Sequence, residues 1–354
     1  SGLVPVLFAV CGPVVSGPAL LVGLADQVVM TADAYAFVSG PRMVRQFTGV
    51  PISNEVLGGA GTHARATGIA SLVVRNREEA LDALGDLLAY LPNSVDDPAP
   101  RYKVDDPTDR RTPEAGAVIP ASPTGSYDVR DVIRPLVDDG EFLEIRAHWA
   151  PNLVTGFATV AGHAVGIVAN QPCRIAGTLD IPASHKGARF VSFCDAFNLP
   201  LVTLIDTPGF FPGKDLEWRG MIRHGAQMAF AYARATVPRV SIALRKCYGG
   251  AYIVMDSKTM GGDLALAWPS AEIAVMGAKG AVEILHRAAS PEEKLAAERD
   301  YEERLLNPYL AAERGLVDMV IDPAETRREL AAALELLMSK RETVPRRVHD
   351  NTPL

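Results

Sequence analysis

The chain has 354 residues, of which 48% are hydrophobic and 22% charged, and its formal net charge is −7. This length exceeds what one hydrophobic core usually serves, so two domains are expected. The negative charge, without a basic run beyond Arg346 and Arg347, argues against a nucleic-acid-binding surface. Proline or aspartate interrupts every apolar stretch well short of the roughly 20 residues that a membrane span needs, which excludes a transmembrane protein.

The cysteines and histidines form no recognisable cluster. Four cysteines lie at positions 11, 173, 194 and 247 without a paired metal-binding spacing, and the seven histidines form no HxxxH pattern. The sequence therefore predicts no metal site, and it predicts free thiols suited to a reducing cytoplasm. Residues 1–30 are apolar but contain three prolines and no basic segment, so they are expected to form buried strand and turn rather than a signal peptide.

Short apolar runs followed by turns predict the buried β-strands. They lie at residues 4–10, 199–205 and 240–244. Near-continuous apolar strands beside Gly/Pro turns are typical of sheets covered by helices on both faces, so the fold class is α/β. Amphipathic patterns predict covering helices at residues 76–91, 189–197, 293–306 and 326–338.

A proline- and aspartate-rich stretch divides the chain. Residues 92–126 hold few apolar residues and several prolines, a composition typical of a linker on the surface. We therefore predict one domain at residues 1–91 and a second at residues 127–354.

The two predicted domains share a weak repeat. The strand that starts at Val4-Pro5 and ends in VSGPA (15–19) matches the strand that starts at Val237-Pro238 and ends in YGGAY (248–252), at a constant offset of 233. Residues 34–41 match residues 271–278 at an offset of 237. Only three residues precede the strand in the first copy, so the first domain is expected to lack its N-terminal half. The rest of that domain would come from elsewhere in the protein or from another chain.

The turn at residues 248–252 is the best candidate for chemistry. Gly249 and Gly250 let the backbone approach a ligand closely, and the first turn of the following helix presents unpaired N–H groups. These groups suit an oxyanion, although an ordinary strand-to-helix turn would also use glycine. Recurrence of the turn at Ser16 and Gly17 favours the oxyanion interpretation, since two copies would stabilise two developing oxyanions by a few kcal/mol per donor.

Side-chain catalysts are scarce. The nucleophile motif GxSxG does not occur, and the histidines lie apart, with His185 and His224 nearest the glycine-bearing segments. Asp206 ends a buried strand before a Pro-Gly turn, where it is expected to accept hydrogen bonds from turn N–H groups rather than move protons. No dedicated side-chain base is therefore expected.

Several motifs follow one another in a recognisable order. The second domain contains NQP (170–172), SHKGARF (184–190), FCDAFN (193–198), DTPGF (206–210), IRHGA (222–226), RKCYGGAY (245–252) and AVMGAKGA (274–281), and the first contains EVLGGA (55–60). Over essentially the whole chain this series resembles the carboxyltransferase (β) subunits of biotin-dependent acyl-CoA carboxylases, of the acetyl- and propionyl-CoA carboxylase type.

The resemblance implies two crotonase-like (ββα spiral) domains and a ring-shaped hexamer, with active sites between domains of opposed subunits. It also implies partners, a biotin carboxylase and a biotin carboxyl carrier, and synthesis of malonyl-CoA or an alkylmalonyl-CoA for fatty acids or polyketides. Carboxybiotin would release CO2, biotin would take the α-proton of the acyl-CoA, and the enolate would attack CO2. With biotin as the base, the protein needs oxyanion donors rather than a basic side chain.

The resemblance also assigns residues. The turn that begins at Gly249 would hold the biotin oxyanion through the N–H groups of Gly250 and Ala251, while Ser16 and Gly17 would hold the thioester enolate. Tyr252 and Ile253 would contact the substrate. Propionyl-preferring relatives carry Asp at the position of Ile253, so a different acyl group is expected here, although an apolar pocket discriminates one methylene by only about 1–3 kcal/mol.

Some alternatives remain open. The first copy reads GPVVSGP (12–18) where the family reads GPCAGGA, and Pro18 has no N–H. Either Ser16 and Gly17 are the donors or this half-site is weakened. A biotin-dependent decarboxylase acting on a malonyl-type CoA would have a similar sequence, and the altered loop is also compatible with a non-catalytic scaffold.

Overall fold

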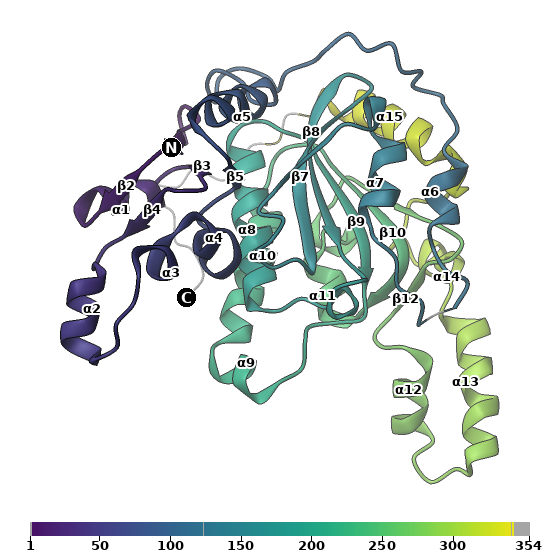
Figure 1. Ribbon diagram of the computed structural model, residues 1–354. Helices are drawn as coiled ribbons and strands as arrows, with labels where there is room; N and C mark the ends of the chain where they lie inside the picture. The colour runs from purple at the N-terminus through teal and green to yellow at the C-terminus, as the bar shows by residue number, and fades with distance from the viewer. Residues whose placement is uncertain (1, 123, 341, 343–354) are drawn as a thin grey trace.

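The computed structural model describes residues 2–122, 124–340 and 342. Figure 1 shows a small N-terminal part beside a larger part that is built on one broad sheet. Residues 2–91 form a three-stranded parallel sheet, β1-β3-β5, and a two-stranded parallel sheet, β2-β4. The elements of this part are β1 (Leu7–Val10), β2 (Pro13–Val15), α1 (Gly17–Gly23), β3 (Gln27–Thr31), β4 (Tyr35–Phe37), α2 (Pro41–Thr48), α3 (Asn54–Gly58), α4 (Ala60–Thr62), a π-helix (His63–Thr67), β5 (Leu72–Val74) and α5 (Arg77–Ala89).

The larger part contains an eight-stranded sheet in the order β13-β11-β10-β9-β8-β7-β6, with β12 paired to the end of β10. Its strands are β6 (Phe142–Ile145), β7 (Leu153–Val160), β8 (His163–Asn170), β9 (Leu201–Thr207), β10 (Arg239–Tyr248), β11 (Leu264–Ala267), β12 (Glu272–Ala274) and β13 (Met319–Val320). Its helices are α6 (Pro113–Ala117), α7 (Arg130–Leu136), α8 (Ile181–Ala196), α9 (Lys214–Trp218), α10 (Met221–Arg234), α11 (Gly249–Val254), α12 (Ala278–Leu285), α13 (Pro291–Leu305), α14 (Pro308–Glu313) and α15 (Thr326–Leu337).

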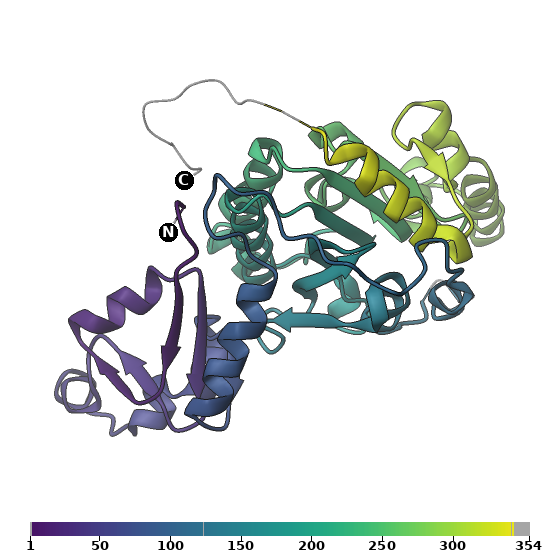
Figure 2. The same ribbon diagram turned by 90° about the horizontal axis from the view of Figure 1, so that it is seen from above.

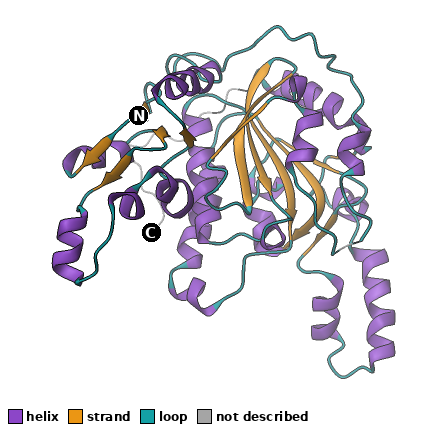
Figure 3. Cartoon of the chain, in the orientation of Figure 1, coloured by secondary structure: helices purple, strands orange, loops and turns teal. Residues whose placement is uncertain are grey.

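Helices cover both faces of the large sheet, as Figure 3 shows by secondary structure. One face packs against α8, α10 and α11 through buried side chains that include Phe190, Met228 and Ala251. The other packs against α7 and α15 through a second cluster that includes Trp268 and Leu334. Strands β7 to β10 are almost wholly buried, which accounts for their near-continuous apolar sequence. The predicted α/β class is confirmed.

The predicted elements are present, but their extents differ: the strand predicted at 4–10 begins at Leu7, and the strand predicted at 199–205 spans Leu201–Thr207. The strand predicted at 240–244 runs on to Tyr248, because the charged pair Arg245 and Lys246 lies inside the sheet rather than beyond it. The helix predicted at 189–197 begins at Ile181, where the Asp180 side chain caps it by accepting from the Ala183 N–H at 2.9 Å. In both places, polar residues that suggest the end of an element in the sequence instead belong to it, since Arg245 and Lys186 are buried within β10 and α8.

The repeat is stronger in the structure than in the sequence. In the first copy Leu7 of β1 pairs with Gln27 of β3, and in the second Val240 of β10 pairs with Leu264 of β11, which are the positions 233 and 237 residues later. The corresponding pairs are Pro13 with Tyr35 and Lys246 with Glu272, and Val29 with Leu72 and Leu266 with Met319. The two copies therefore share strand order and register. Helix α12 also begins 237 residues after α2.

The two copies differ in how their first strand is flanked. Strand β10 lies between β9 and β11, whereas in the described residues β1 pairs only with β3. The domain boundaries at 91 and 127 stay a prediction.

Residues 92–122 and 124–126 run across the top of the larger part, as Figure 2 shows from above. Their anchor is Arg327 of α15, which is fully buried and donates to the Asp138 carboxylate at 2.7 Å and to the Leu136 carbonyl at 3.0 Å. The same side chain lies 3.2 Å from the carboxylate of Asp106 in the stretch itself, and Asp106 pairs with Arg110 at 2.7 Å. This network fastens the stretch to the sheet.

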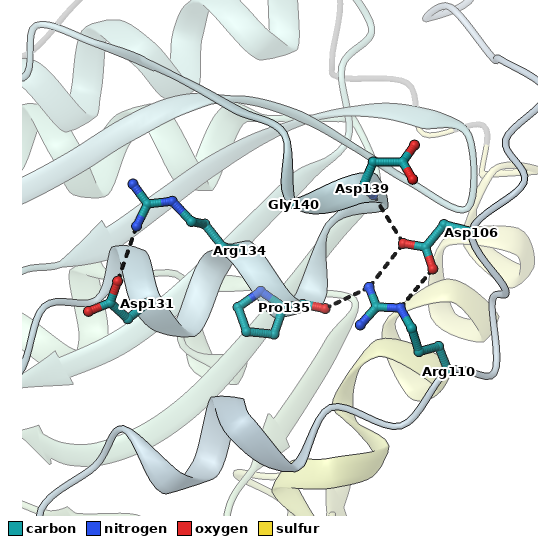
Figure 4. Close-up of a pocket in the computed structure, with 7 residues that line it drawn as sticks. All are labelled: Asp106, Arg110, Asp131, Arg134, Pro135, Asp139 and Gly140. Carbon is teal, nitrogen blue, oxygen red and sulfur yellow. Dashed lines mark hydrogen bonds and ion pairs between the residues drawn. The ribbon is translucent and has the colours of Figure 1, made fainter.

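A hollow of about 570 Å³ lies beside this network (Figure 4). Four of its charged side chains form two pairs, Arg110 with Asp106 and Arg134 with Asp131 at 3.1 Å. The hollow lies between α7 and the extended stretch, away from both glycine turns. We therefore interpret it as part of the anchoring of the stretch, not as a catalytic site.

The N-terminal part is joined to the larger part through the segment after β6. Arg146 donates to the Gly68 carbonyl at 2.8 Å and to the Gln27 side chain at 3.2 Å. Lys186 of α8 holds the same segment by donating to the carbonyls of Arg146 at 2.9 Å and Trp149 at 3.0 Å. Burial lowers the pKa of Lys186 to about 7. These contacts fix how the two copies of the repeat are oriented.

A substitution at Gly68 tests this joint. Gly68 has φ +69°, and a Cβ there would clash with the Trp149 ring. Gly68→Ala is expected to lower the free energy of unfolding by roughly 3 kcal/mol, because the positive φ and the clash both add cost. Chemical denaturation measures this. The matched control is Gly85→Ala in the middle of α5, where a Cβ meets nothing within 4 Å, and it should stabilise by up to about 1 kcal/mol. If the two variants changed the free energy of unfolding equally, the proposed packing of Gly68 against Trp149 would be wrong.

Candidate functional site

The second glycine turn connects β10 directly to α11. Gly249 has φ +57°, and a Cβ there would lie 3.0 Å from the Val275 carbonyl oxygen, so both conformation and space favour glycine. Gly250 follows in the first helical turn, beside the ring of Phe210, and Ala251 is fully buried. Amides in the first turn of a helix have no acceptor within that helix. The turn therefore presents the N–H groups of Gly250 and Ala251 as donors at the start of α11.

The Tyr248 side chain fixes the end of β10 just before this turn. The Tyr248 hydroxyl donates to the carboxylate of Glu272 on β12, and the Tyr248 ring lies against Gly277 at the start of α12. Burial, reinforced by Glu272, raises the pKa of Tyr248, and burial raises the pKa of Tyr252. Both phenols are therefore neutral at physiological pH and are unsuited to act as bases.

An apolar cavity of about 340 Å³ adjoins the turn. It opens beside Gly249, and both predicted substrate-contacting residues, Tyr252 and Ile253, line it. Arg314 is the only charged residue in its lining, whose remaining members are Thr259, Ile273, Ala274, Val275, Tyr301, Leu305, Leu310, Ala311 and Leu316. A cavity of this kind suits an aliphatic or ring-shaped group rather than a highly charged one.

The first turn has the same backbone path with different residues. Ser16 is the counterpart of Gly249 and has φ 61°, a conformation that a serine adopts only under strain. Its N–H donates to the Phe37 carbonyl at 2.9 Å, within the pairing of β2 with β4. Pro18 has no N–H, so Gly17 is left as the free backbone donor at the start of α1. Of the two predicted first-site donors, Ser16 therefore has its amide already engaged.

The structure does not bring the two predicted half-sites together within one chain. Figure 1 places α1 in the N-terminal part and α11 under the large sheet, with α8 and α10 between them. Ser16 and Gly17 thus lie at one place, and Gly249, Gly250 and Ala251 at another. A site that uses both turns needs the second turn of another molecule.

The two histidines nearest the glycine segments contact each other. The ring centroids of His185 on α8 and His224 on α10 lie 4.3 Å apart, and burial lowers the pKa of His185. His224 Nε2 lies 3.3 Å from a guanidinium nitrogen of Arg223, and His224 Nδ1 lies 3.3 Å from the side-chain oxygen of Gln227. No carboxylate contact orients either ring in the described structure, so they do not form a catalytic dyad.

Asp206 has a structural role, as predicted, but with different partners. Its carboxylate accepts from the Lys246 N–H on the neighbouring strand at 3.1 Å and from the Arg245 side chain at 3.0 Å, rather than from its own turn. Burial raises the pKa of Asp206, while Arg245 acts in the opposite direction. Sequence reasoning missed Arg245, Glu272 and Phe210. The adjacent charges before the Tyr-Gly-Gly turn were the only signal.

The described residues offer neither a membrane-spanning helix nor a metal-binding cluster. Within residues 2–122, 124–340 and 342, no helix combines the length and apolarity that crossing a membrane requires. The same ranges contain no group of three or more histidine, cysteine, aspartate or glutamate side chains placed to hold a metal ion. All four cysteines are unpaired thiols.

Comparison with known proteins gives a consistent result. The family model described as the carboxyl transferase domain matches residues 1–352. The chain is 46% identical over its whole length to the propionyl-CoA carboxylase beta chain of Saccharopolyspora erythraea, of which it covers 68%. It is equally similar to the human mitochondrial propionyl-CoA carboxylase beta chain, of which it covers 66%. A structure of the transcarboxylase 12S hexamer with hydrolysed methylmalonyl-coenzyme A bound superposes with a TM-score of 0.97 at 44% identity, over all of this chain and 69% of the other.

Because both turns have a positive φ, adding a side chain to one turn and removing a side chain from the other should change stability in opposite directions. Gly249→Ala places a side chain at φ +57° and should lower the free energy of unfolding by about 1–2 kcal/mol. Ser16→Gly removes a side chain from φ 61° and should raise it by about 1 kcal/mol. Equilibrium denaturation of both variants beside the parent protein measures the pair. Destabilisation by Ser16→Gly would show that the serine side chain makes a stabilising contact that outweighs the strain.

Proposed function

Because the chain belongs to the carboxyl transferase family, we propose that it is the carboxyltransferase (β) subunit of a biotin-dependent acyl-CoA carboxylase. It transfers a carboxyl group from carboxybiotin to the α-carbon of an acyl-CoA and yields malonyl-CoA or an alkylmalonyl-CoA. The observation that carries this proposal is the pair of strand–turn–helix units with shared register, each ending where backbone N–H groups are available. Relatives that are named as carboxylase beta chains favour this direction over a decarboxylase or an inert scaffold.

The second turn is proposed to bind the ureido oxygen of biotin. The N–H groups of Gly250 and Ala251 lie in the first turn of α11, where they have no acceptor within the helix. Biotin supplies the carboxyl group and the base for the α-proton. The protein then needs donors that stabilise negative charge as it develops, and fixed backbone N–H groups do this without reorganisation. The phenols of Tyr248 and Tyr252 are neutral, which agrees with biotin rather than a tyrosine acting as the base.

The first turn is proposed to bind the thioester oxygen of the acyl-CoA. Here Gly17 is the free backbone donor, because the Ser16 amide is bonded to Phe37 and Pro18 has none. The thioester half-site therefore has one backbone donor fewer than the biotin half-site. We propose that the enolate is held less firmly than the biotin anion.

Exposed apolar side chains lie at equivalent positions in the two copies of the repeat. Leu20 and Ile253 lie in the helices that follow the turns, and Phe47 and Ile284 lie on α2 and α12, exposed by 80% and 65%. Large apolar side chains clustered on a surface mark an interaction site. This supports an assembly in which the first turn of one subunit faces the second turn of another, within a hexamer such as transcarboxylase 12S forms.

Further partners follow from the same proposal. A biotin carboxylase and a biotin carboxyl carrier would load and deliver the carboxyl group, while the acyl-CoA enters separately. The four free thiols support a cytoplasmic location, where thiols stay reduced. No basic surface for nucleic acid is expected at a net charge of −7.

Removing one donor from the second turn tests the function. Ala251→Pro deletes the N–H of Ala251 and copies Pro18 of the first turn, in a helical turn where the ring is tolerated. Carboxyl transfer to a panel of acyl-CoAs from acetyl to long-chain is expected to fall about 100-fold or more in kcat, since one oxyanion donor contributes roughly 3 kcal/mol. Ala251→Gly keeps the N–H and is the control.

The parent protein gives the decisive baseline for that experiment. With carrier, biotin carboxylase, ATP and bicarbonate supplied, it should carboxylate at least one acyl-CoA of the panel. Failure with every acyl-CoA would reject the proposed function, whereas full activity of Ala251→Pro would reject only the assigned donor.

Ile253 is proposed to limit the acyl chain. Its side chain lines the cavity beside the turn and is 43% exposed. Ile253→Ala would enlarge the cavity by three carbons and should raise the ratio of kcat/KM for a longer acyl-CoA to that for a shorter one by about 10-fold, within the 1–3 kcal/mol that apolar pockets discriminate. Competition between two acyl-CoAs in one reaction measures this ratio directly. An unchanged ratio would place the acyl chain elsewhere.

A further inference from the structure

We propose that Asp206, together with Arg245 and Tyr127, is a positioning group that sets the orientation of the second turn. This inference rests on the proposed function and concerns residues that do not touch the reacting atoms. An irregularity in the sheet lies about four residues before Gly249.

Strands β9 and β10 lose their regular pairing just before the turn. Ala243 pairs with Ile205, and the next pair is Cys247 with Thr207. Two steps along β9 thus correspond to four along β10, so β10 bulges at residues 244–246. A bulge removes N–H groups from the ladder and redirects the strand beyond it. The last part of β10 then pairs with β12 and ends in the turn.

Asp206 lies on β9 opposite this bulge and replaces the lost ladder bonds. One carboxylate oxygen accepts from the Lys246 N–H at 3.1 Å. The other accepts from the Arg245 guanidinium at 3.0 Å and from the Tyr127 hydroxyl at 2.8 Å. The residue is 1% exposed, so these three donors replace water around the charge. The shape of the bulge is therefore set by the carboxylate.

Arg245 extends the network to the chain that precedes α7. Its guanidinium donates to the Gly125 carbonyl at 2.8 Å and lies over the Tyr127 ring at 5.2 Å. Arg245 is itself buried, with 5% exposed. Three segments distant in sequence thus meet at one carboxylate. A shift of this carboxylate would move the bulge, and only Cys247 and Tyr248 separate the bulge from the turn.

In the first copy of the repeat, other residues stand at the positions of Arg245 and Lys246. The counterparts of Arg245 and Lys246 are Gly12 and Pro13, which offer neither a guanidinium nor an N–H at those places. In that copy the strand is interrupted at this point, with β1 ending at Val10 and β2 starting at Pro13. The donors that bind Asp206 beside the second turn are therefore not repeated at these positions beside the first turn.

Three variants test this role. Asp206→Asn keeps the shape and one acceptor but removes the charge, Arg245→Met removes the guanidinium, and Tyr127→Phe removes a single hydroxyl with little risk to folding. For each, kcat and KM for the acyl-CoA are measured per folded protein, with thermal unfolding recorded in parallel. We expect Asp206→Asn and Arg245→Met to lower kcat about 100-fold with KM changed less than threefold, because a displacement of about 1 Å in an oxyanion site has that effect.

A matched control separates positioning from stability. Asp138 forms an equally buried pair with Arg327 at 2.7 Å in the network that anchors residues 92–126. Asp138→Asn should lower the unfolding temperature without changing kcat of the folded enzyme. An equal loss of kcat in Asp138→Asn, or an unchanged kcat in Asp206→Asn and Tyr127→Phe, would overturn the inference.

Hydrogen exchange provides a readout that does not need activity. Amides of residues 247–251 should exchange at least 10-fold faster in Asp206→Asn than in the parent protein, while Asp138→Asn leaves them unchanged. If the parent protein carboxylates no acyl-CoA, the proposed function fails, yet faster exchange would still support the positioning group. Unchanged exchange in Asp206→Asn and Tyr127→Phe would reject it whatever the activity.

Discussion

The pairing of β10 with its neighbours is the constraint on which the rest of the structure depends. Its first half lies between β9 and β11, and its second half is paired to β12 beyond a bulge. The strand can therefore end in only one place, at Tyr248, where a hydrogen bond to Glu272 holds it. The helix that follows must start at Gly249, and its first N–H groups are aimed by the sheet rather than by a flexible loop. A site built on rigid elements in this way can stabilise charge without reorganisation.

The repeat shows how one backbone path is adapted to two tasks. Register is conserved between the copies, and the turns have nearly the same φ at Gly249 and Ser16, 57° and 61°. Side chains and donors differ, because Pro18 lacks an N–H and the Ser16 amide is bonded to Phe37. The Arg245 guanidinium and the Lys246 N–H that Asp206 binds are replaced by Gly12 and Pro13 in the first copy. Two oxyanions of unequal basicity would be matched by two half-sites of unequal strength.

Much of the fold could be predicted from local patterns. Buried strands follow from continuous apolar runs, and α5 and α15 follow from their stripes, since Asn76 caps α5 as its sequence suggests. The end of β10 could not be predicted in this way, because Arg245 and Lys246 look like the end of a strand. They lie within the sheet only because Asp206, some 40 residues earlier, neutralises one and binds the amide of the other.

The candidate site, like the fold, was predictable only where its signals are local in the sequence. The glycines of the second turn are local signals, and the motifs around them identify a family. Engagement of the Ser16 amide depends on Phe37, which reaches it through strand pairing, and the separation of the two turns depends on how the copies pack.

The proposed roles of the two turns are tested most directly by a structure of the assembled protein with an acyl-CoA and biotin. It predicts the biotin ureido oxygen within about 3 Å of the Gly250 and Ala251 nitrogens and the thioester oxygen at Gly17 of another subunit. Both ligands bound away from these turns would contradict it.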